Sequence, residues 1–216
     1  MINKLKWLLA IPLILSFALG LPWLTTGDLL WFLASWSDAL FVLLVLATGA
    51  TAVAFVDSER GNRHPGLSRL LISLGLILVI PVTVWERTYG PGVGRGVAWS
   101  LIGLVVCLSA APLGISARHA LGKNYVPDPE ILPGQILVTH GPYRYVRHPL
   151  YSTALLWGTG LALLMRSPWG LAVIALFLVP AVIVRIREEE PILQEAFGEE
   201  YCGYVAQSWR LIPYIY

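Results

Sequence analysis

The fold is decided by one stretch of the sequence, Leu150-Tyr-Ser-Thr-Ala-Leu-Leu-Trp-Gly-Thr-Gly-Leu-Ala-Leu-Leu-Met165-Arg-Ser-Pro-Trp169-Gly-Leu-Ala-Val-Ile-Ala-Leu-Phe-Leu-Val-Pro-Ala-Val-Ile-Val184. It holds two apolar segments, Leu150–Met165 and Trp169–Val184, separated only by Arg166-Ser167-Pro168. A membrane-spanning helix needs about 20 mostly apolar residues, and about 17 is near the lower limit. Two helices joined by so short a connection must run antiparallel, so this stretch predicts a helical hairpin in the membrane.

Four further apolar segments precede the hairpin: Trp7–Leu24, Ala39–Val56, Ser68–Trp85 and Val97–Ile115. The 216-residue chain is 56% hydrophobic and only 13% charged, and its mean hydropathy is +0.69. Because average soluble domains carry roughly 25% charged residues, this composition excludes a soluble enzyme, a disordered chain and a secreted disulfide scaffold. We predict an all-α, polytopic membrane helix bundle with a C-terminal helical hairpin.

The basic residues give the predicted orientation of these six spans. With a cytoplasmic N-terminus, the inside segments hold Lys4, Lys6, Arg60, Arg63, Arg69, Arg118, Lys123, Arg144, Arg147, Arg185, Arg187 and Arg210, and the outside loops hold Arg87, Arg95 and Arg166. Cytoplasmic loops of membrane proteins carry an excess of Lys and Arg. We therefore expect a multi-pass integral membrane protein with six spans and both termini in the cytoplasm.

The chain shows no internal domain boundary. We expect one membrane domain over residues 1–216, with three N-terminal spans in 1–96 and the functional core in 97–216. Cys107 and Cys202 form no C-x-x-C pair, so no disulfide framework and no metal site is implied. A net charge of +2 is too small to indicate nucleic-acid binding.

The most informative polar stretch is Gln135-Ile-Leu-Val-Thr-His-Gly-Pro-Tyr143-Arg-Tyr-Val-Arg147-His148-Pro149-Leu-Tyr151, before the fifth span. On composition alone it suits an interfacial belt, in which Tyr anchors and Arg extends toward the headgroups. Against that interpretation, Pro149 suits the first turn of a helix. The side chain of His148 and the neighbouring backbone donors would then face a cytoplasmic cavity.

A second polar stretch, Arg185-Ile-Arg-Glu-Glu-Glu190, follows the sixth span. Arg185 and Glu189 are four residues apart on one helix face, although such pairs are commonly just solvated. Pro191 predicts a kink or a restart of the helix. Beyond it, apolar residues recur at helical spacing and indicate an amphipathic helix on the membrane surface or on the protein's own cytoplasmic face: Ile192, Leu193, Ala196, Phe197, Tyr201 and Val205.

Together the two stretches resemble the isoprenylcysteine carboxyl methyltransferase family. The resemblance rests on L-V-x-x-G-P-Y-x-x-V-R-H-P-x-Y at 137–151, R-x-x-x-E-E-x-x-L at 185–193 and F-G-x-x-Y at 197–201, with a weaker likeness around 117–124. It covers about the last 100 residues and none of the first three spans. One departure is Gln135, where many members have His.

The resemblance implies methyl transfer from S-adenosylmethionine, bound without a Rossmann fold in a cytoplasmic-side pocket closed by the hairpin and the tail. Carried over by position, the cofactor-binding residues are Gln135, Ile136, Leu137, Val138, Tyr143, His148, Pro149, Leu150, Tyr151 and Glu189. Arg185 takes the substrate-arginine position and, with Glu189, is expected to be catalytic. The implied partners are membrane lipids and a lipophilic small-molecule or prenylated substrate.

The chemistry of these residues fits that implication. Glu189 can pair with the ammonium of the cofactor, His148 with its carboxylate, and the rings of Tyr143 and Tyr151 with its sulfonium. A carboxylate acceptor needs no strong base, because it is already nucleophilic at neutral pH, and Arg185 can orient it.

Other functions remain open from the residues. A phospholipid amine or a small thiol would have to lose a proton, with Glu188 or Glu190 as the base. A non-catalytic transporter or scaffold is a third possibility, although transporter sites tend to lie near the bilayer midplane and these polar residues cluster at its cytoplasmic edge.

Overall fold

In the computed structural model, the residues described are 23–24, 27, 38–45, 67–90, 97–126, 131 and 133–216. Their named helices are α5 (Leu67–Tyr89), α6 (Val97–Leu121), α7 (Pro149–Leu164), α8 (Pro168–Val173) and α9 (Val179–Val205). Short helical turns are η2 (Gly122–Asn124), η3 (Gly141–Arg144) and the π-helical η4 (Ile174–Leu178). Within these ranges there is no β-strand, only an isolated bridge between Val146 and Trp209, and the all-α prediction is confirmed.

Among the described residues, three helices are long and apolar enough to cross a membrane: Leu71–Tyr89, Val97–Asn124 and Pro168–Val205. Helix α7 is apolar but shorter. The expected spans Ser68–Trp85, Val97–Ile115 and the two arms of the hairpin therefore all fall on helices. The first expected span lies almost entirely outside the described residues, and of the second only 39–45 is described, as helix.

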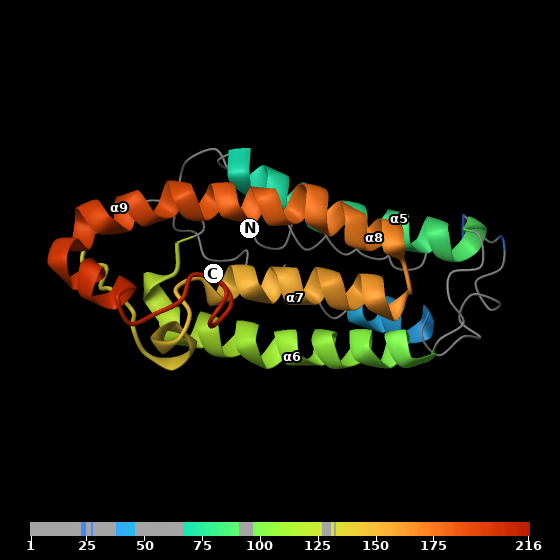
Figure 1. Cartoon of the computed structure of the whole chain (residues 1–216), viewed down its shortest axis with the longest axis horizontal. Helices are drawn as coiled ribbons and strands as arrows, with labels where there is room; N and C mark the ends of the chain where they lie inside the picture. Colours follow the sequence, from blue (N-terminus) through green and yellow to red (C-terminus); the bar gives the residue numbers. More distant parts are fainter. Residues whose placement is uncertain are drawn as a thin grey trace, which may run out of the picture.

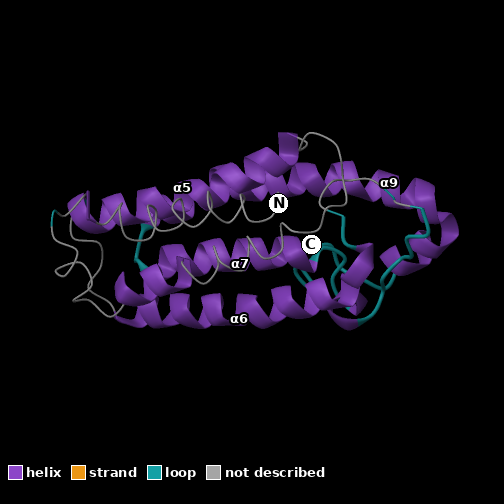
Figure 2. Cartoon of the chain, turned by 180° about the vertical axis from the view of Figure 1, so that it is seen from behind, coloured by secondary structure: helices purple, strands orange, loops and turns teal. Residues whose placement is uncertain are grey.

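The described helices run along one long axis (Figure 1). Helix α7 lies beside α6, and on its other side is a layer made of α5 together with α8, η4 and α9. Seen from behind, the loops before α7 and after α9 gather at one end of the bundle (Figure 2). The bundle therefore presents its irregular segments together at that end.

Two glycines allow α6 and α7 to approach each other closely. A Cβ atom added to Gly103 would lie 2.2 Å from the backbone nitrogen of Leu164, and one added to Gly160 would lie 2.5 Å from Cys107 Sγ. Small residues at such positions let membrane helices pack backbone to backbone. The Ser100 hydroxyl adds a hydrogen bond to the Leu164 carbonyl at 2.9 Å.

The hairpin turn is fixed by polar groups at the opposite end of the bundle from these loops. Ser167 caps α8, since its hydroxyl oxygen accepts from Gly170 N at 2.9 Å. The buried Glu86 of α5 accepts from Trp169 N at 3.0 Å and from the Ser167 hydroxyl. The predicted hairpin is confirmed, and a carboxylate from α5 stabilises its turn.

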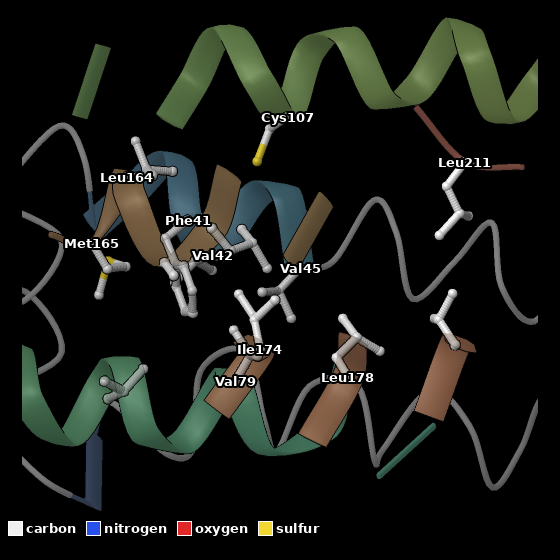
Figure 3. Close-up of a cluster of buried hydrophobic side chains, with 14 of the residues drawn as sticks. Phe41, Val42, Val45, Val79, Cys107, Leu164, Met165, Ile174, Leu178 and Leu211 are labelled. Atoms are coloured by element: carbon white, nitrogen blue, oxygen red, sulfur yellow. The ribbon is translucent and has the colours of Figure 1, made fainter. Parts of the chain in front are cut away.

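A cluster of buried apolar side chains joins the layers (Figure 3). It includes Phe41 from the helical segment 38–45, Val79 from α5, Leu164 from α7 and Leu178 from η4. Leu211, from the segment after α9, packs into the same cluster. The C-terminal segment is thereby fixed to the bundle.

The expectation of a kink or restart at Pro191 is wrong. α8, η4 and α9 form one continuous helix through Pro191, and the non-helical residue lies further on, at Gly198 (φ 53°, ψ −123°). Pro191 has no backbone N–H, so the helix loses only the hydrogen bond to the carbonyl of Arg187, four residues earlier. Arg187 is exposed, so water can hydrogen-bond to that carbonyl instead. Glycine adopts a positive φ with little strain, whereas other residues do not, so the chain bends at Gly198 instead.

Candidate functional site

A cavity of about 310 Å³ is lined by the loop residues that gather at one end of the bundle. Its wall combines the segment between α6 and α7, the start of α7 and the second half of α9. The lining residues are Ile72, Leu121, Asn124, Tyr125, Val126, Ile131, Gln135, Ile136, Leu137, Val138, Tyr143, Arg147, His148, Leu150, Tyr151, Ala154, Glu189, Ile192, Leu193, Phe197, Tyr201 and Tyr204. Pockets of roughly this size bind small molecules.

The loop 133–148 is shaped by the Gly-Pro pair that opens η3. Gly141 has a φ of 62°, which glycine adopts without strain, and Pro142 starts the helical turn that carries Tyr143. Tyr143 is buried with Val138 and with Ala117 of α6. Burial, followed by the nearby charge of Glu189, raises the pKa of Tyr143, so its phenol stays neutral.

His148 precedes α7 directly and Pro149 is the first residue of that helix, as expected from the sequence. His148 is 4% exposed, and its ring stacks on that of Tyr151 with the centroids 5.6 Å apart. Its Nε2 lies 3.6 Å from Glu190 Oε1, beyond hydrogen-bond distance, and has no hydrogen-bond partner among the described residues.

Tyr151 links the two stretches that the sequence marks as functional. Its hydroxyl donates to Glu189 Oε2 at 2.7 Å and accepts from Arg185 Nε at 3.0 Å. The Arg185 side chain is 2% exposed and reaches α5, where its Nη1 donates to the hydroxyl of Ser68 at 3.3 Å. That hydroxyl donates to Glu188 Oε2 at 2.5 Å. Arg185 is therefore held from both sides, with its neighbour Tyr151 in the cavity wall.

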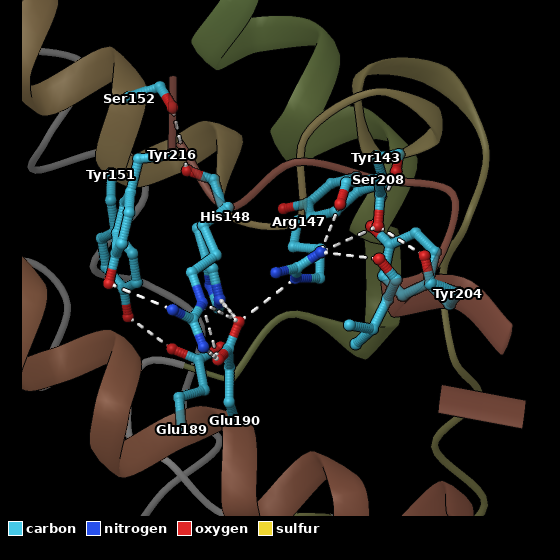
Figure 4. A network of polar contacts seen from close by, with 12 residues as sticks. Tyr143, Arg147, His148, Tyr151, Ser152, Glu189, Glu190, Tyr204, Ser208 and Tyr216 are labelled. Atoms are coloured by element: carbon cyan, nitrogen blue, oxygen red, sulfur yellow. Dashed lines mark hydrogen bonds and ion pairs between the residues drawn. The ribbon is translucent and has the colours of Figure 1, made fainter. Parts of the chain in front are cut away.

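Glu190 joins three segments of the chain (Figure 4). Its carboxylate accepts from Arg147 Nε at 3.1 Å and lies 2.8 Å from Arg210 Nη2, while His148 is close by. Contact with Glu190 raises the pKa of Arg210. Arg147 also donates to the Val205 carbonyl at 3.2 Å and to the Ser208 carbonyl. Glu190 thus fastens the loop before α7 and the C-terminal segment onto α9.

Glu189 differs from Glu190 in its partners. No ion pair joins it to a basic side chain of the described residues, and its one hydrogen bond comes from a neutral phenol. Within the described part of the chain, the cavity therefore has a carboxylate without a cationic partner. Two of its lining residues, His148 and Tyr201, also carry a buried polar atom that has no hydrogen-bond partner there, His148 Nε2 and the Tyr201 hydroxyl. A bound molecule with a cationic group would complement Glu189.

The structure brings nearly all of the expected site residues together. Every expected cofactor residue except Pro149 lines the cavity, and Pro149 is buried beside His148 at the start of α7. Arg185 is not in the cavity wall but contacts Tyr151, which is. Gln135, the departure from the family pattern, donates to the Asn124 carbonyl at 3.2 Å and so fixes the loop to η2.

Sequence reasoning missed part of the wall. The apolar side of the tail helix supplies Ile192, Leu193, Phe197 and Tyr201 to the cavity. Their helical spacing predicts an amphipathic helix either on the membrane surface or on the protein's own cytoplasmic face. The structure shows these side chains packed against the protein itself, in the cavity wall. Tyr125 carried no signal of its own, because only the folding back of the loop brings it to the cavity, whereas the adjoining η2 lies within the weaker family likeness around 117–124.

Comparisons with known proteins find methyltransferases. A family model described as phospholipid methyltransferase matches residues 99–200. Protein-S-isoprenylcysteine O-methyltransferase A of Arabidopsis thaliana is 33% identical over 176 residues, which cover 81% of this chain and 86% of the relative. A probable protein-S-isoprenylcysteine O-methyltransferase of Oryza sativa subsp. indica is 31% identical over 185 residues, covering 77% of this chain and 94% of the relative.

The protein-S-isoprenylcysteine O-methyltransferase of Tribolium castaneum is 32% identical over 133 residues, which are 60% of this chain and 47% of the relative. Among solved structures, that of a eukaryotic intramembrane Ras methyltransferase, isoprenylcysteine carboxyl methyltransferase, superposes with a TM-score of 0.64. The match covers 93% of this chain and 74% of that one at 22% identity, and it shows the shared membrane helical fold.

Proposed function

The chain belongs to the protein-S-isoprenylcysteine O-methyltransferase family, and we propose that it methylates the carboxylate of an isoprenylcysteine-like acceptor, using S-adenosylmethionine. The observation that carries the proposal is the cavity itself. It collects the family's cofactor positions from two distant stretches of the chain, and it leaves Glu189 without a cationic partner among the described residues.

The residues of the cavity fit the proposed cofactor, which supplies an activated methyl group when bound. Glu189 would pair with its ammonium, and His148 Nε2 would meet an acidic oxygen. The faces of Tyr143 and Tyr151 suit a sulfonium, because an aromatic face attracts cations. The apolar part of the wall, from Ile136 and Leu137 to Ile192 and Leu193, suits a nucleobase.

Arg185 is the proposed substrate residue. A guanidinium binds a carboxylate through two parallel hydrogen bonds, so it can both orient the acceptor and balance its charge. Ser68 and Tyr151 hold this side chain in place. Methyl transfer needs the nucleophile, the carbon and the sulfur in line, so positioning by such contacts is the main catalytic contribution that we propose.

We propose that the site faces the cytoplasm, with both termini on that side and six spans in all. The helix Pro168–Val205 contains 38 residues. Up to the bend at Gly198, residues 168–197 extend roughly 45 Å at about 1.5 Å per residue, whereas the hydrocarbon core is about 30 Å thick. The part of this helix that follows its first 20 or so residues, which carries Glu189, would therefore project from the membrane. The acceptor would be a prenylated or other lipophilic molecule that enters at the boundary.

Methylation of a phospholipid amine is the second candidate, because the matched family model is described as phospholipid methyltransferase. An amine must lose a proton, and Glu188 and Glu190 were the expected bases. Glu190 is held by two arginines, and Glu188 accepts a hydrogen bond from Ser68. Both carboxylates are engaged, which favours a carboxylate acceptor.

The test is transfer of labelled methyl groups from S-adenosylmethionine by the purified full chain in lipid. The acceptors are a farnesylated cysteine analogue with a free carboxylate and, separately, phosphatidylethanolamine. We expect label in the first product that base releases as methanol, since methyl esters are base-labile. Base-stable label in the phospholipid alone would overturn the carboxylate proposal and support the amine.

A further inference from the structure

The segment after α9 and the loop before α7 expose large apolar side chains outside the membrane-crossing helices. Tyr214 and Ile215 are 86% and 76% exposed, and the side chains of Tyr145, Trp209 and Ile212 are exposed as well. We call these five residues the exposed patch. Soluble surfaces rarely gather large apolar side chains in one place, and where they do, the surface commonly contacts a partner or a membrane.

Contacts between the two segments bring the residues of the exposed patch together. Trp209 N donates to the Tyr145 carbonyl at 2.9 Å. The rings of Trp209 and Tyr214 lie with their centroids 5.4 Å apart. Ile215 N donates to the Ile212 carbonyl at 3.1 Å, so these two residues belong to one turn. The exposed patch is therefore one surface, built from two segments that are distant in the sequence.

The start of α7 indicates the depth of this surface in the membrane. The C-terminal segment lies beside it (Figure 1), and the hydroxyl of Ser152, in the first turn of α7, donates to the Leu211 carbonyl at 2.6 Å. Helix α7 has 16 residues and is about 24 Å long, whereas the hydrocarbon core is about 30 Å thick. With the hairpin turn at the opposite boundary, the first turn of α7 would lie no further out than the near edge of that core.

The long helix that ends in α9 indicates the same depth. Arg210, which stands between Trp209 and Leu211, has its Nη2 2.8 Å from the carboxylate of Glu190. The helix from Pro168 to Glu190 extends about 33 Å, close to the thickness of the hydrocarbon core. Glu190 would therefore lie near the point where the helix leaves the core, and the segment that Arg210 fastens to it would lie at the same level.

Arginines border the exposed patch. The guanidinium of Arg144 lies over the ring of Tyr145 at 5.9 Å, and that of Arg210 lies over the ring of Tyr216 at 5.2 Å. Tyr and Trp are enriched where a membrane protein meets the headgroups, and Arg side chains extend from apolar surroundings toward the polar boundary. An aromatic surface with a basic edge at this depth suits the headgroup layer of a bilayer.

We propose that the exposed patch is an interfacial anchor, inserted among the headgroups and upper acyl chains of the leaflet at the end of the bundle where the loops gather. Its ligand is a lipid surface. Through the ion pair of Arg210 with Glu190, the anchor ties the half of α9 that lines the cavity to the membrane boundary. The inference goes beyond the proposed function, because the anchor would be the same for any methyl acceptor.

The experiment measures the depth of nitroxide labels on the full chain in phosphatidylcholine vesicles by electron paramagnetic resonance. Oxygen serves as the lipid-soluble relaxation agent and a nickel chelate as the water-soluble one. The labelled positions are Ile215→Cys and, independently, Ile212→Cys, so that one damaged variant does not decide the result. Both are made in a Cys202→Ser background, because Cys202 is exposed, whereas Cys107 is buried.

Two exposed positions outside the exposed patch provide the matched controls. Leu176→Cys places the label on η4, in the membrane-crossing part of the long helix. Glu195→Cys places it on α9 beyond Glu190, in the part that would project into water. The label at Leu176 should be relaxed mainly by oxygen, and the label at Glu195 mainly by the nickel chelate.

We expect the labels at Ile212 and Ile215 to follow the Leu176 control, with relaxation by oxygen exceeding relaxation by the nickel chelate. A label at either position that follows the Glu195 control would overturn the inference, because the exposed patch would then face water. Labels shielded from both agents would also overturn it, since protein, such as a second copy of the chain, would then cover the exposed patch. None of these outcomes alters the proposed methyl transfer, which the labelled-cofactor assay tests separately.

Discussion

Replacing Glu190 by Gln tests how the site is held together. The substitution keeps the shape of the side chain and removes its charge. In the structure Glu190 contacts Arg147 Nε at 3.1 Å and Arg210 Nη2 at 2.8 Å. These contacts join α9 to the loop before α7 and to the C-terminal segment, so the change addresses the assembly of the cavity rather than its contact with a ligand.

The magnitude follows from the burial of the two pairs. The side chains of Glu190 and Arg147 are 15% and 8% exposed, and that of Arg210 is 40% exposed. Breaking a buried pair costs about 3–5 kcal/mol, whereas an exposed pair contributes less than about 1 kcal/mol. Gln retains one acceptor, and the backbone bond from Arg147 N to the Trp209 carbonyl at 2.7 Å remains. We therefore expect a loss of about 2–3 kcal/mol.

For a chain of this size that loss corresponds to a fall of about 5–10 °C in melting temperature. The assay is thermal unfolding of the purified protein in detergent, with Glu195→Gln as the control. Glu195 is an exposed carboxylate on the same helix. The control should melt within about 2 °C of the wild type, since exposed substitutions change stability by at most about 0.5 kcal/mol. Equal melting of Glu190→Gln and the wild type would refute the reasoning.

Three further predictions concern the acceptor arginine, its support and the packing of the bundle. Arg185→Ala should retain its affinity for S-adenosylhomocysteine in calorimetry and lose methyl transfer. Retained turnover would contradict the proposal that Arg185 orients the acceptor. Ser68→Ala should lower kcat about tenfold without changing that affinity, because the Arg185 side chain loses a hydrogen bond, and Ser68→Thr should restore the rate; failure of the rescue would contradict a positioning role. Gly160→Ala should destabilise the protein by about 1–3 kcal/mol in denaturant unfolding, since its Cβ would lie 2.5 Å from Cys107 Sγ. Gly203→Ala, whose Cβ meets nothing within 4 Å, should be neutral or stabilising, and equal losses at both glycines would count against the close α6–α7 contact.

Much of the helical core could be predicted from the sequence because the membrane imposes simple rules on apolar length. The segment 150–184 contains its own turn, and Ser167 and Pro168 start α8 just where a short connection requires a cap. The likeness of residues 137–151 to a known family also located one wall of the cavity. Both patterns are local in the sequence, so they can be recognised without knowledge of long-range contacts.

The contacts between distant segments could not be predicted in this way. The pairing of Arg147 and Arg210 with Glu190 depends on the chain folding back after Gly198. The local sequence pattern does not determine which of the three neighbouring glutamates forms these ion pairs. The continuation of α9 through Pro191 was likewise not predicted. It depends on the exposure of the Arg187 carbonyl to water, which only the folded structure determines. Tyr201 was visible only as part of an apolar helix face.

The central claim is that residues near 148 and near 189 share one cavity that binds a sulfonium methyl donor through its charged amino-acid end. The most direct measurement is calorimetric titration of S-adenosylhomocysteine into the purified wild type, Glu189→Ala and His148→Ala. We predict saturable binding of one molecule per chain to the wild type and no measurable binding to either variant. No binding to the wild type, or undiminished binding to both variants, would contradict the account.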